Sequence, residues 1–455
     1  MGLVDVPSLT KQIEKGEIDT VIAAFPDLYG RLMGKRITGR FFLDSIVKHG
    51  MHACDYLLAC DMEMDPVPGY AFTSWKTGYG DMHAQLDLPT MRTLPWLPKS
   101  ALVLCDLYRG EEERPVEIAP RQVLRRQVER ARAMGFRPMI GSELEFYVFQ
   151  ETYESARKKR YHDLQTIGTY IEDYHLLQGT KEEFVIREIR NSMDAAGVPV
   201  EFSKGEWGPG QQEINLRFTD ALEMADRHVL YKHGAREIAI AKGCAITFMA
   251  KWNEKFAGSS CHLHASLWDT GGKRSLMADP DRPHGWSELF GHFLAGLLAH
   301  ARELALFYAS NVNSYKRYQS GSFAPTRIAA SIDNRTTAFR IVGHGDSLRV
   351  ENRLPGADVN PYLSFSAALA AGLDGIERRL EPPATFSGDA YVTGGLPTVP
   401  FTLEEAILEF EKSELARRAF GEEVVEHYLH AGRTEVRKFR EVVTCWELDR
   451  HFERT

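Results

Sequence analysis

The chain has 455 residues, of which 44% are hydrophobic and 26% are charged, as is usual for a globular enzyme with more than one domain. Its 55 basic and 63 acidic side chains leave a net charge of −8, which argues against nucleic acid as a partner. The most hydrophobic stretch, residues 289–309, contains His292, Arg302 and Glu303, so it predicts a core helix and not a membrane span.

The first part of the chain predicts a small domain of short strands and turns. Residues 19–25 have a strand pattern, residues 25–37 a hairpin pattern, and a helix over residues 41–49 is expected to end at Gly50. The composition becomes charged and proline-containing over residues 110–120. We therefore expect an N-terminal domain over residues 1–112 and a catalytic domain over residues 113–455.

Beyond this boundary, signals for helix ends alternate with strand patterns. Thr180 and Glu183 predict the capping box of a helix that ends before Gly197. Strand patterns that face each other across short turns, such as residues 200–204 and 211–218, predict antiparallel pairing. The predicted fold class is α+β. The six cysteines form no CxxC pair, which favours a reducing, cytoplasmic location.

Four predicted strands each place unusual polar side chains on one face, because side chains alternate along a strand with a period of two. One such strand alone could have a solvated outer face. Together, however, carboxylate, imidazole and guanidinium groups suit divalent cations and anions. The pattern predicts a metal-dependent phosphoryl-transfer site or an ATP-dependent ligase site. The sets are Glu143 and Glu145; Glu213, Asn215 and Arg217; His262, His264 and Ser266; Arg349, Glu351 and Arg353; and Glu206 adds a further carboxylate.

The same stretches, in the same order, resemble glutamine synthetase of the bacterial type over nearly the whole chain. The motifs are SELEF (142–146), EWGPGQQE (206–213), GSSCHLHASLW (258–268), NSYKR (313–317) followed by APT, DNRTTAFR (333–340) and RVENRLPG (349–356). The resemblance implies a β-grasp-like N-terminal domain and a catalytic domain built on a curved antiparallel sheet. It also implies ATP as co-substrate, two or more Mg²⁺ or Mn²⁺ ions, L-glutamate as substrate, and a homo-dodecamer of two stacked hexameric rings.

The resemblance also assigns roles to individual residues. Arg335 matches the arginine that contacts the transferring phosphate, and Glu201 and Lys204 lie near further nucleotide contacts. An ion-pair role for Arg349 and a structural role for His264 remain open. The remaining matches are Glu145, Glu206 and Glu213 for one metal ion; Glu143, His262 and Glu351 for the second; Gly258, His264, Arg317 and Arg353 for glutamate; and Ser266, Arg340 and Arg349 for ATP.

The sequence departs from the family at the expected ammonium pocket. Where ammonia-dependent relatives have a flap of the form KRLVPGYEAP, this chain has KRYQSGSFAP, so Phe323 replaces the glutamate. Pro68 or Gly69 stands where an aspartate is expected. We therefore expect Phe323 to contact an organic amine rather than free ammonium. The amino-acid sequence of several stretches resembles that of ligases that use ethanolamine, so ethanolamine is the expected amine. Polyamines, alkylamines and arylamines are the alternatives.

Two other interpretations stay open at this point. The chain could be an ordinary glutamine synthetase whose ammonium pocket uses Asp61, Glu63 or Asp65. It could also be a non-catalytic relative with a structural or regulatory role. Such a relative would usually have lost metal ligands, and all six matching positions carry ligand side chains here.

Overall fold

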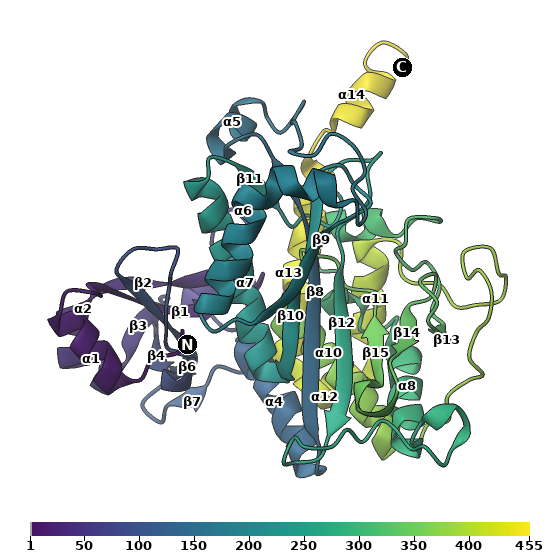
Figure 1. Ribbon diagram of the computed structural model, residues 1–455, viewed down its shortest axis with the longest axis horizontal. Helices are drawn as coiled ribbons and strands as arrows, with labels where there is room; N and C mark the ends of the chain where they lie inside the picture. The colour runs from purple at the N-terminus through teal and green to yellow at the C-terminus, as the bar shows by residue number, and fades with distance from the viewer. Residues whose placement is uncertain (1) are drawn as a thin grey trace.

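The computed structural model describes residues 2–455, which form two β-sheets and a set of helices, a fold of the predicted α+β class (Figure 1). The first sheet has the strand order β2-β1-β6-β4-β3, and both β5 and β7 pair with β6. Strands β1 and β6 run parallel, and the other pairs are antiparallel. Its strands are β1 (Thr20–Pro26), β2 (Leu32–Thr38), β3 (Met51–Cys54), β4 (Asp81–Leu86), β5 (Arg92–Thr93), β6 (Ser100–Arg109) and β7 (Arg114–Pro115).

The predicted hairpin and helix of this region are both confirmed. Strands β1 and β2 pair antiparallel, and the Asp27 carboxylate closes their turn by accepting hydrogen bonds from the backbone N–H groups of Tyr29 (3.0 Å) and Arg31 (2.8 Å). Helical residues 39–49 comprise α2 (Gly39–Phe41), a π-helical segment (Phe42–Ile46) and α3 (Val47–His49). They end before Gly50, whose φ of 64° suits a residue without a side chain.

The second sheet is larger and has the order β13-β14-β15-β12-β8-β10-β9, with β11 paired to β8. All its pairs are antiparallel except β13 with β14, so the predicted antiparallel pairing is confirmed. The strands are β8 (Arg137–Phe149), β9 (Val200–Gly205), β10 (Gln211–Asp220), β11 (Ala245–Thr247), β12 (Cys261–Trp268), β13 (Ala330–Ile332), β14 (Phe339–Val342) and β15 (Arg349–Asn352).

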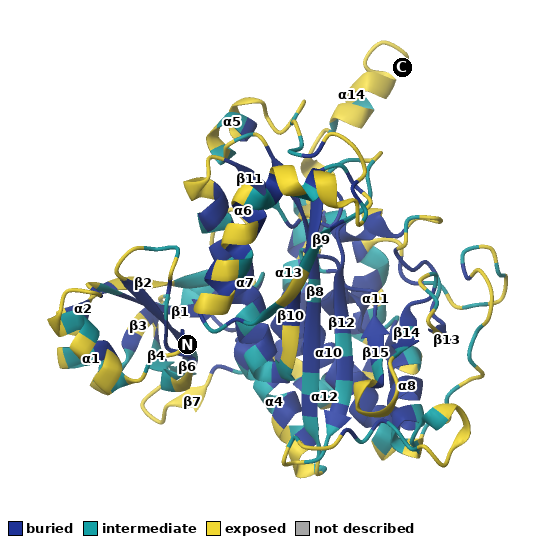
Figure 2. Ribbon diagram, viewed as in Figure 1, coloured by how far each residue is buried: buried dark blue, intermediate teal, exposed yellow. Residues whose placement is uncertain are grey.

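Helices cover the second sheet, and α10 is almost entirely buried among them (Figure 2). Helix α14 extends away from the body of the molecule (Figure 1). No helix in the described part of the chain is long and apolar enough to cross a bilayer. The helices are α1 (Val6–Glu14), α4 (Pro120–Ala133), α5 (Tyr153–Lys158), α6 (Leu176–Ala195), α7 (Ala221–Ala241), α8 (Glu288–His300), α9 (Ala305–Tyr308), α10 (Pro361–Glu377), α11 (Leu403–Lys412), α12 (Glu414–Phe420), α13 (Glu422–Glu441) and α14 (Cys445–His451).

Two helix predictions were wrong in detail. Helix α6 begins at Leu176, so Thr180 lies inside it, and its hydroxyl donates to the Leu176 carbonyl (3.1 Å) instead of capping. Threonine makes such bonds inside helices as well as at caps, so the motif alone does not fix the start. The apolar stretch 289–309 is buried as predicted, but it is divided into α8 and α9 and is not one helix.

Candidate active site

The second sheet presents one face to its covering helices and the other to a cavity. On β8, Leu144 and Phe146 are fully buried, and the Phe146 ring lies 6.4 Å from the ring of Tyr231 on α7. Glu143 and Glu145 alternate with them and therefore point to the opposite face, where they line the cavity. The same alternation holds on β12, where Cys261 and Leu263 are buried and His262 lines the cavity.

Strand register then brings the polar side chains of neighbouring strands together. Glu145 is paired with Glu213 on β10, and Glu143 with His262 on β12. His264 is paired with Glu351 on β15. Four of the six predicted metal-ligand positions therefore face one another across β8 because of backbone pairing alone.

Arg217 does not join this face, contrary to the strand pattern. The register of β10 shifts between Leu216 and Thr219, and the backbone N–H of Arg217 donates to the Pro199 carbonyl (2.9 Å). An irregularity of this kind interrupts the alternation of side chains. Arg217 accordingly lines neither of the two cavities described below.

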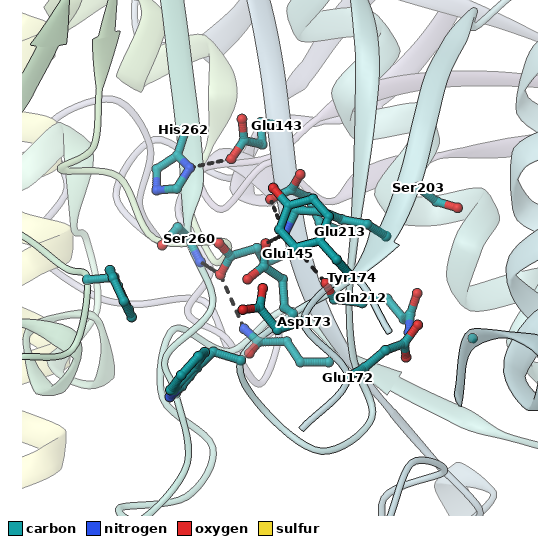
Figure 3. A pocket seen from close by; sticks show the side chains of 18 of the residues that line it. Glu143, Glu145, Glu172, Asp173, Tyr174, Ser203, Gln212, Glu213, Ser260 and His262 are labelled. Carbon is teal, nitrogen blue, oxygen red and sulfur yellow. Dashed lines mark hydrogen bonds and ion pairs between the residues drawn. The ribbon is translucent and has the colours of Figure 1, made fainter. Parts of the chain in front are cut away.

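Two groups of side chains have the composition of metal sites. Ligand atoms of Glu145, Glu206 and Glu213 all lie within 4.8 Å of one another, and so do those of Glu143, Glu145 and His262. The sixth predicted ligand, Glu351, is close by: its Oε1 lies 3.8 Å from His262 Nδ1. Figure 3 shows Glu143, Glu145, Glu213 and His262 around one cavity. Carboxylate oxygens with one imidazole form a donor set that suits Mg²⁺ or Mn²⁺.

The negative charges within the first group are only partly compensated by neighbouring side chains. Burial and the nearby Glu206 raise the pKa of Glu145 to about 8, and burial with Glu143 and Glu206 raises the pKa of Glu213 well above its ordinary value. Lys204 partly offsets this negative charge, since its ammonium contacts Glu206 and lies 3.9 Å from Glu213. Buried carboxylates that repel one another are what a divalent cation would stabilise, so the residues present fit a metal ion here.

The second group is compensated by its neighbours. Burial opposes ionisation of Glu143, but His262, whose Nδ1 lies 2.5 Å from Glu143 Oε1, and His264 hold its pKa well below the ordinary value. Burial also opposes ionisation of Glu351, but Arg353 and His262 lower its pKa to about 2. Both carboxylates are therefore ready to bind a cation at neutral pH without first losing a proton.

The carboxylate groups line a cavity of about 850 Å³. The predicted catalytic residue Arg335 lies on its wall, together with Arg340, Arg353, Gly258 and Phe323. Lys204, which the family resemblance places near the nucleotide contacts, also lies on this wall. The cavity therefore combines clustered carboxylates with three guanidinium groups, an arrangement suited to metal-bound anions.

A second cavity, of about 780 Å³, adjoins the first, and Glu143, Phe202 and Arg340 line both. It contains the other predicted ATP-binding residues, Ser266, Arg349 and Glu201. His264, predicted to contact glutamate, lies in this second cavity, where Arg349 Nε donates to its Nδ1 (3.2 Å). The shared wall allows one extended ligand, or two ligands that react with each other, to occupy both cavities.

Arg317 is the one predicted binding residue that lines neither cavity. It is only 1% exposed and donates to the hydroxyl of Ser260 (3.1 Å) and to backbone carbonyls of Arg353 (3.2 Å) and Leu354. A Cβ on Gly258 would lie 2.5 Å from the Arg317 side chain, so only glycine, which has no side chain, fits at this position. In this structure Arg317 supports the wall from behind, and its role toward glutamate stays a prediction.

The carboxylates proposed for an ordinary ammonium pocket lie elsewhere in the chain. Asp61 contacts the ammonium of Lys438 on α13 and accepts hydrogen bonds from the backbone of Glu63 (3.1 Å) and Asp65 (2.9 Å). None of these three carboxylates lines the cavity of its own chain. Phe323, in contrast, lines the cavity. Its backbone carbonyl, which is part of the flap, accepts a hydrogen bond from Arg353 (3.1 Å).

The sequence also missed residues of this cavity. Asp173, Tyr174 and Trp207 line it, and the backbone N–H of Asp173 donates to the Glu206 carbonyl (3.2 Å). Tyr174 lies under the Lys204 ammonium, 4.5 Å from its ring centroid. Asp173 and Tyr174 belong to a loop without a strand or helix pattern, so the sequence gave no reason to select them. Trp207 lies within the EWGPGQQE motif, but one aromatic residue in a turn does not by itself indicate a binding site.

The fold and the site together define a class of protein: an α+β enzyme whose sheet face gathers carboxylates, imidazoles and guanidinium groups for divalent cations and anionic substrates. The chain belongs to the glutamine synthetase family, since the family model described as "Glutamine synthetase, catalytic domain" matches residues 117–451. It is thus a ligase of the glutamine synthetase type.

Relatives in this family cover the chain from end to end. The gamma-glutamylethanolamide synthetase of Streptomyces coelicolor is 51% identical over 99% of this chain and 96% of its own length. The glutamate–isopropylamine ligase of a Pseudomonas species is 37% identical over 97% of this chain and 96% of its own. A solved structure of a GmaS–ADP complex is 29% identical, with a TM-score of 0.83, and the match covers 98% of this chain and 99% of that one.

Proposed function

We propose that the protein joins the γ-carboxylate of L-glutamate to an organic amine at the expense of ATP. One observation carries this choice within the family: an aromatic side chain, Phe323, lines the cavity where an ammonia-dependent enzyme is expected to have a carboxylate. A phenyl ring cannot accept a proton, and it offers a small cation an attraction of only about 0.5–2 kcal/mol. It does offer apolar surface to the carbon atoms of an amine.

Ethanolamine is the proposed amine. It is supported by the relative of 51% identity, which is named for the ethanolamide product. The relative of 37% identity is named for isopropylamine, so a small alkylamine is the second candidate. Polyamines and arylamines remain members of the test panel.

The proposed reaction has two steps. An oxygen of the glutamate γ-carboxylate attacks the terminal phosphorus of ATP, which releases ADP and forms γ-glutamyl phosphate. The nitrogen of the amine then attacks the acyl carbon, phosphate leaves, and the nitrogen loses a proton to give the γ-glutamyl amide. The amine must arrive deprotonated, because a protonated nitrogen has no lone pair.

The chain's own residues divide this work in the proposal. Ser266, Arg340, Arg349 and Glu201 hold ATP in the second cavity, and Lys204 contacts it from the wall of the first. Gly258, His264, Arg317 and Arg353 position glutamate, and Arg335 contacts the phosphoryl group in transfer. Two metal ions, Mg²⁺ or Mn²⁺, would be held by Glu145, Glu206 and Glu213, and by Glu143, His262 and Glu351. When bound, they would neutralise charge on the phosphates.

The proposal includes a cytoplasmic homo-dodecamer of two stacked six-membered rings. Exposed aromatic side chains on protruding segments support an assembly. Helix α14 projects from the body (Figure 1), with Trp446 64% and Phe452 86% exposed, and Trp75 on an N-terminal loop is 83% exposed. Such large side chains are costly to leave in water, and a neighbouring subunit would cover them.

A phosphate-release assay with glutamate, ATP, Mg²⁺ and a panel of amines tests the proposal. The panel contains ammonium, ethanolamine, isopropylamine, putrescine and benzylamine, and mass spectrometry identifies the products. We expect the highest kcat/KM with ethanolamine and a γ-glutamyl amide of matching mass. Turnover of ammonium as efficient as that of the best organic amine would identify an ordinary glutamine synthetase. No turnover together with no Mn²⁺ binding would identify a non-catalytic relative.

A further inference from the structure

A buried lysine on α7 reaches the segment of the chain that follows β15. Lys232 is only 7% exposed, and its ammonium donates hydrogen bonds to the backbone carbonyls of Ala357 (2.8 Å) and Val359 (3.2 Å). Burial and the neighbouring Arg236 lower the pKa of Lys232 to about 7, so the folded chain resists the charge on this side chain. Because a buried ammonium is costly, a lysine at this position indicates a role that an apolar side chain could not fill.

The segment that the lysine holds, residues 355–360, is paired with the start of β12. The backbone N–H of Ala357 donates to the Ser259 carbonyl (3.0 Å), and the N–H of Cys261 donates to the Pro355 carbonyl (3.0 Å). The position of the backbone at the start of β12 therefore depends on the position of this segment.

The same stretch of backbone belongs to the candidate active site. Gly258 and Ser260 line the first cavity, and the N–H of Ser260 donates to the carboxylate of Glu145 (2.7 Å), one of the clustered carboxylates. The Ser259 carbonyl and the Ser260 N–H belong to one planar peptide unit, so a contact that fixes the first also fixes the second. A hydrogen bond of this kind sets the direction of a metal-ligating side chain. A short series of hydrogen bonds thus connects the lysine ammonium with a candidate metal ligand.

The other end of the segment is attached to the first sheet. The side-chain amide of Asn360 donates to the carbonyls of Asp27 (3.3 Å) and Leu28 (3.0 Å), in the turn between β1 and β2. A Cβ on Gly30 would lie 3.3 Å from the Cα of Asn360, so the turn and the segment are in close contact. The segment is therefore held by β12 at one end and by the first sheet at the other, and Lys232 holds it between these two ends.

We propose that Lys232 is a positioning residue of the candidate active site. Its ammonium fixes the 355–360 segment, and the segment fixes the peptide unit that directs Glu145 into the metal cluster. The inference rests on the proposed function for its kinetic part, whereas its metal-binding part depends on the carboxylate cluster alone. The alternative is a purely structural role, in which the lysine stabilises the fold and the cavity wall keeps its position without it.

The experiment compares the wild type with Lys232→Met, whose side chain has a similar length and no hydrogen-bond donor. It measures Mn²⁺ affinity by titration, the KM for glutamate and for ATP, and unfolding in urea. We expect Lys232→Met to weaken Mn²⁺ binding about ten-fold, as the loss of a group that orients a metal ligand does. The KM for glutamate should rise because Gly258 and Ser260 line the first cavity. The KM for ATP should change less, because the predicted ATP-binding residues Ser266 and Arg349 lie in the second cavity.

The matched control is Arg236→Met, which removes a second cation from the same helix. Both cations lie over the ring of Phe248, the ammonium of Lys232 at 5.5 Å and the guanidinium of Arg236 at 4.9 Å from the ring centroid. Arg236 donates to the Lys232 carbonyl within α7 (3.3 Å) and not to the 355–360 segment. Arg236→Met should therefore leave Mn²⁺ affinity and the KM for glutamate unchanged, whatever it does to the free energy of unfolding.

The outcomes distinguish the two roles. If Lys232→Met has a lower free energy of unfolding but keeps the Mn²⁺ affinity and the KM for glutamate of the wild type, the lysine is structural and the proposal is refuted. Equal weakening of Mn²⁺ binding in Lys232→Met and Arg236→Met would also refute it, because the cause would then be a general loosening of α7. If Lys232→Met does not fold, Lys232→Gln, which keeps a donor at shorter reach, should show the same loss of Mn²⁺ affinity to a smaller extent. A wild type that binds Mn²⁺ but forms no amide with any amine would refute the proposed function, and the Mn²⁺ titrations would still decide the positioning role.

Discussion

Glu145→Gln should make the metal-free protein more stable and at the same time weaken its response to metal. The raised pKa of Glu145, about 8 against an ordinary 4.5, means that the folded chain holds this proton while the unfolded chain releases it. The folded state therefore binds more protons, and the stability of the metal-free protein falls as the pH rises from 4.5 to 8. At about pH 7.5 this carboxyl lowers the free energy of unfolding by about 4 kcal/mol relative to its value below pH 4.5. Glutamine at this position, which does not titrate, would remove that loss.

Urea unfolding followed by tryptophan fluorescence measures this effect, first in EDTA and then in saturating Mg²⁺. In EDTA we expect Glu145→Gln to have the higher free energy of unfolding, with less dependence on pH between 5 and 8. In Mg²⁺ the wild type should gain stability and the variant much less, because the variant lacks one carboxylate of the cluster. Glu172→Gln is the matched control: Glu172 is buried in the same cavity, outside both metal groups, and should keep the gain from metal. A variant less stable than the wild type in EDTA would contradict the raised pKa of Glu145, and a variant equally stabilised by Mg²⁺ would refute its assignment as a metal ligand.

Three further predictions concern other parts of the molecule. Phe323→Glu returns a carboxylate to the flap and should raise kcat/KM for ammonium relative to ethanolamine by about ten-fold; an unchanged ratio would contradict the role given to this ring. Burial lowers the pKa of His427 to about 3, so the folded chain resists protonation and stability should fall by about 1.5 kcal/mol between pH 6.5 and 5. His427→Gln, which can still donate to the Leu58 carbonyl (2.8 Å in the wild type), should show a smaller fall in urea unfolding, and an equal fall would contradict the cause. Removal of residues 442–455 deletes α14 and should lower the native mass measured by light scattering, and an unchanged mass would exclude α14 from the assembly.

Much of the fold and of the site followed from local sequence patterns. The period of two along β8, β10 and β12 placed Glu143, Glu145, Glu213 and His262 on one face, and the register of the sheet confirmed that they meet. Gly50 ended its helix as predicted, because a φ of 64° is easy only for glycine. These features depend on neighbouring residues or on one backbone conformation, which is why the sequence by itself determined them.

The tertiary structure decided the features that depend on contacts between distant segments. Threonine at position 180 could cap a helix or lie within one, and in the structure the helix already begins at Leu176, so Thr180 lies within it. Arg317 could reach a ligand or support a wall, and the close approach of Gly258 left it buried. Trp207 and Phe323 come from separate motifs, and no periodicity relates them; only the folding of the flap over the β9–β10 turn brings their rings together. The sequence determined the carboxylate face, and the tertiary structure alone placed Trp207 and Phe323 beside it.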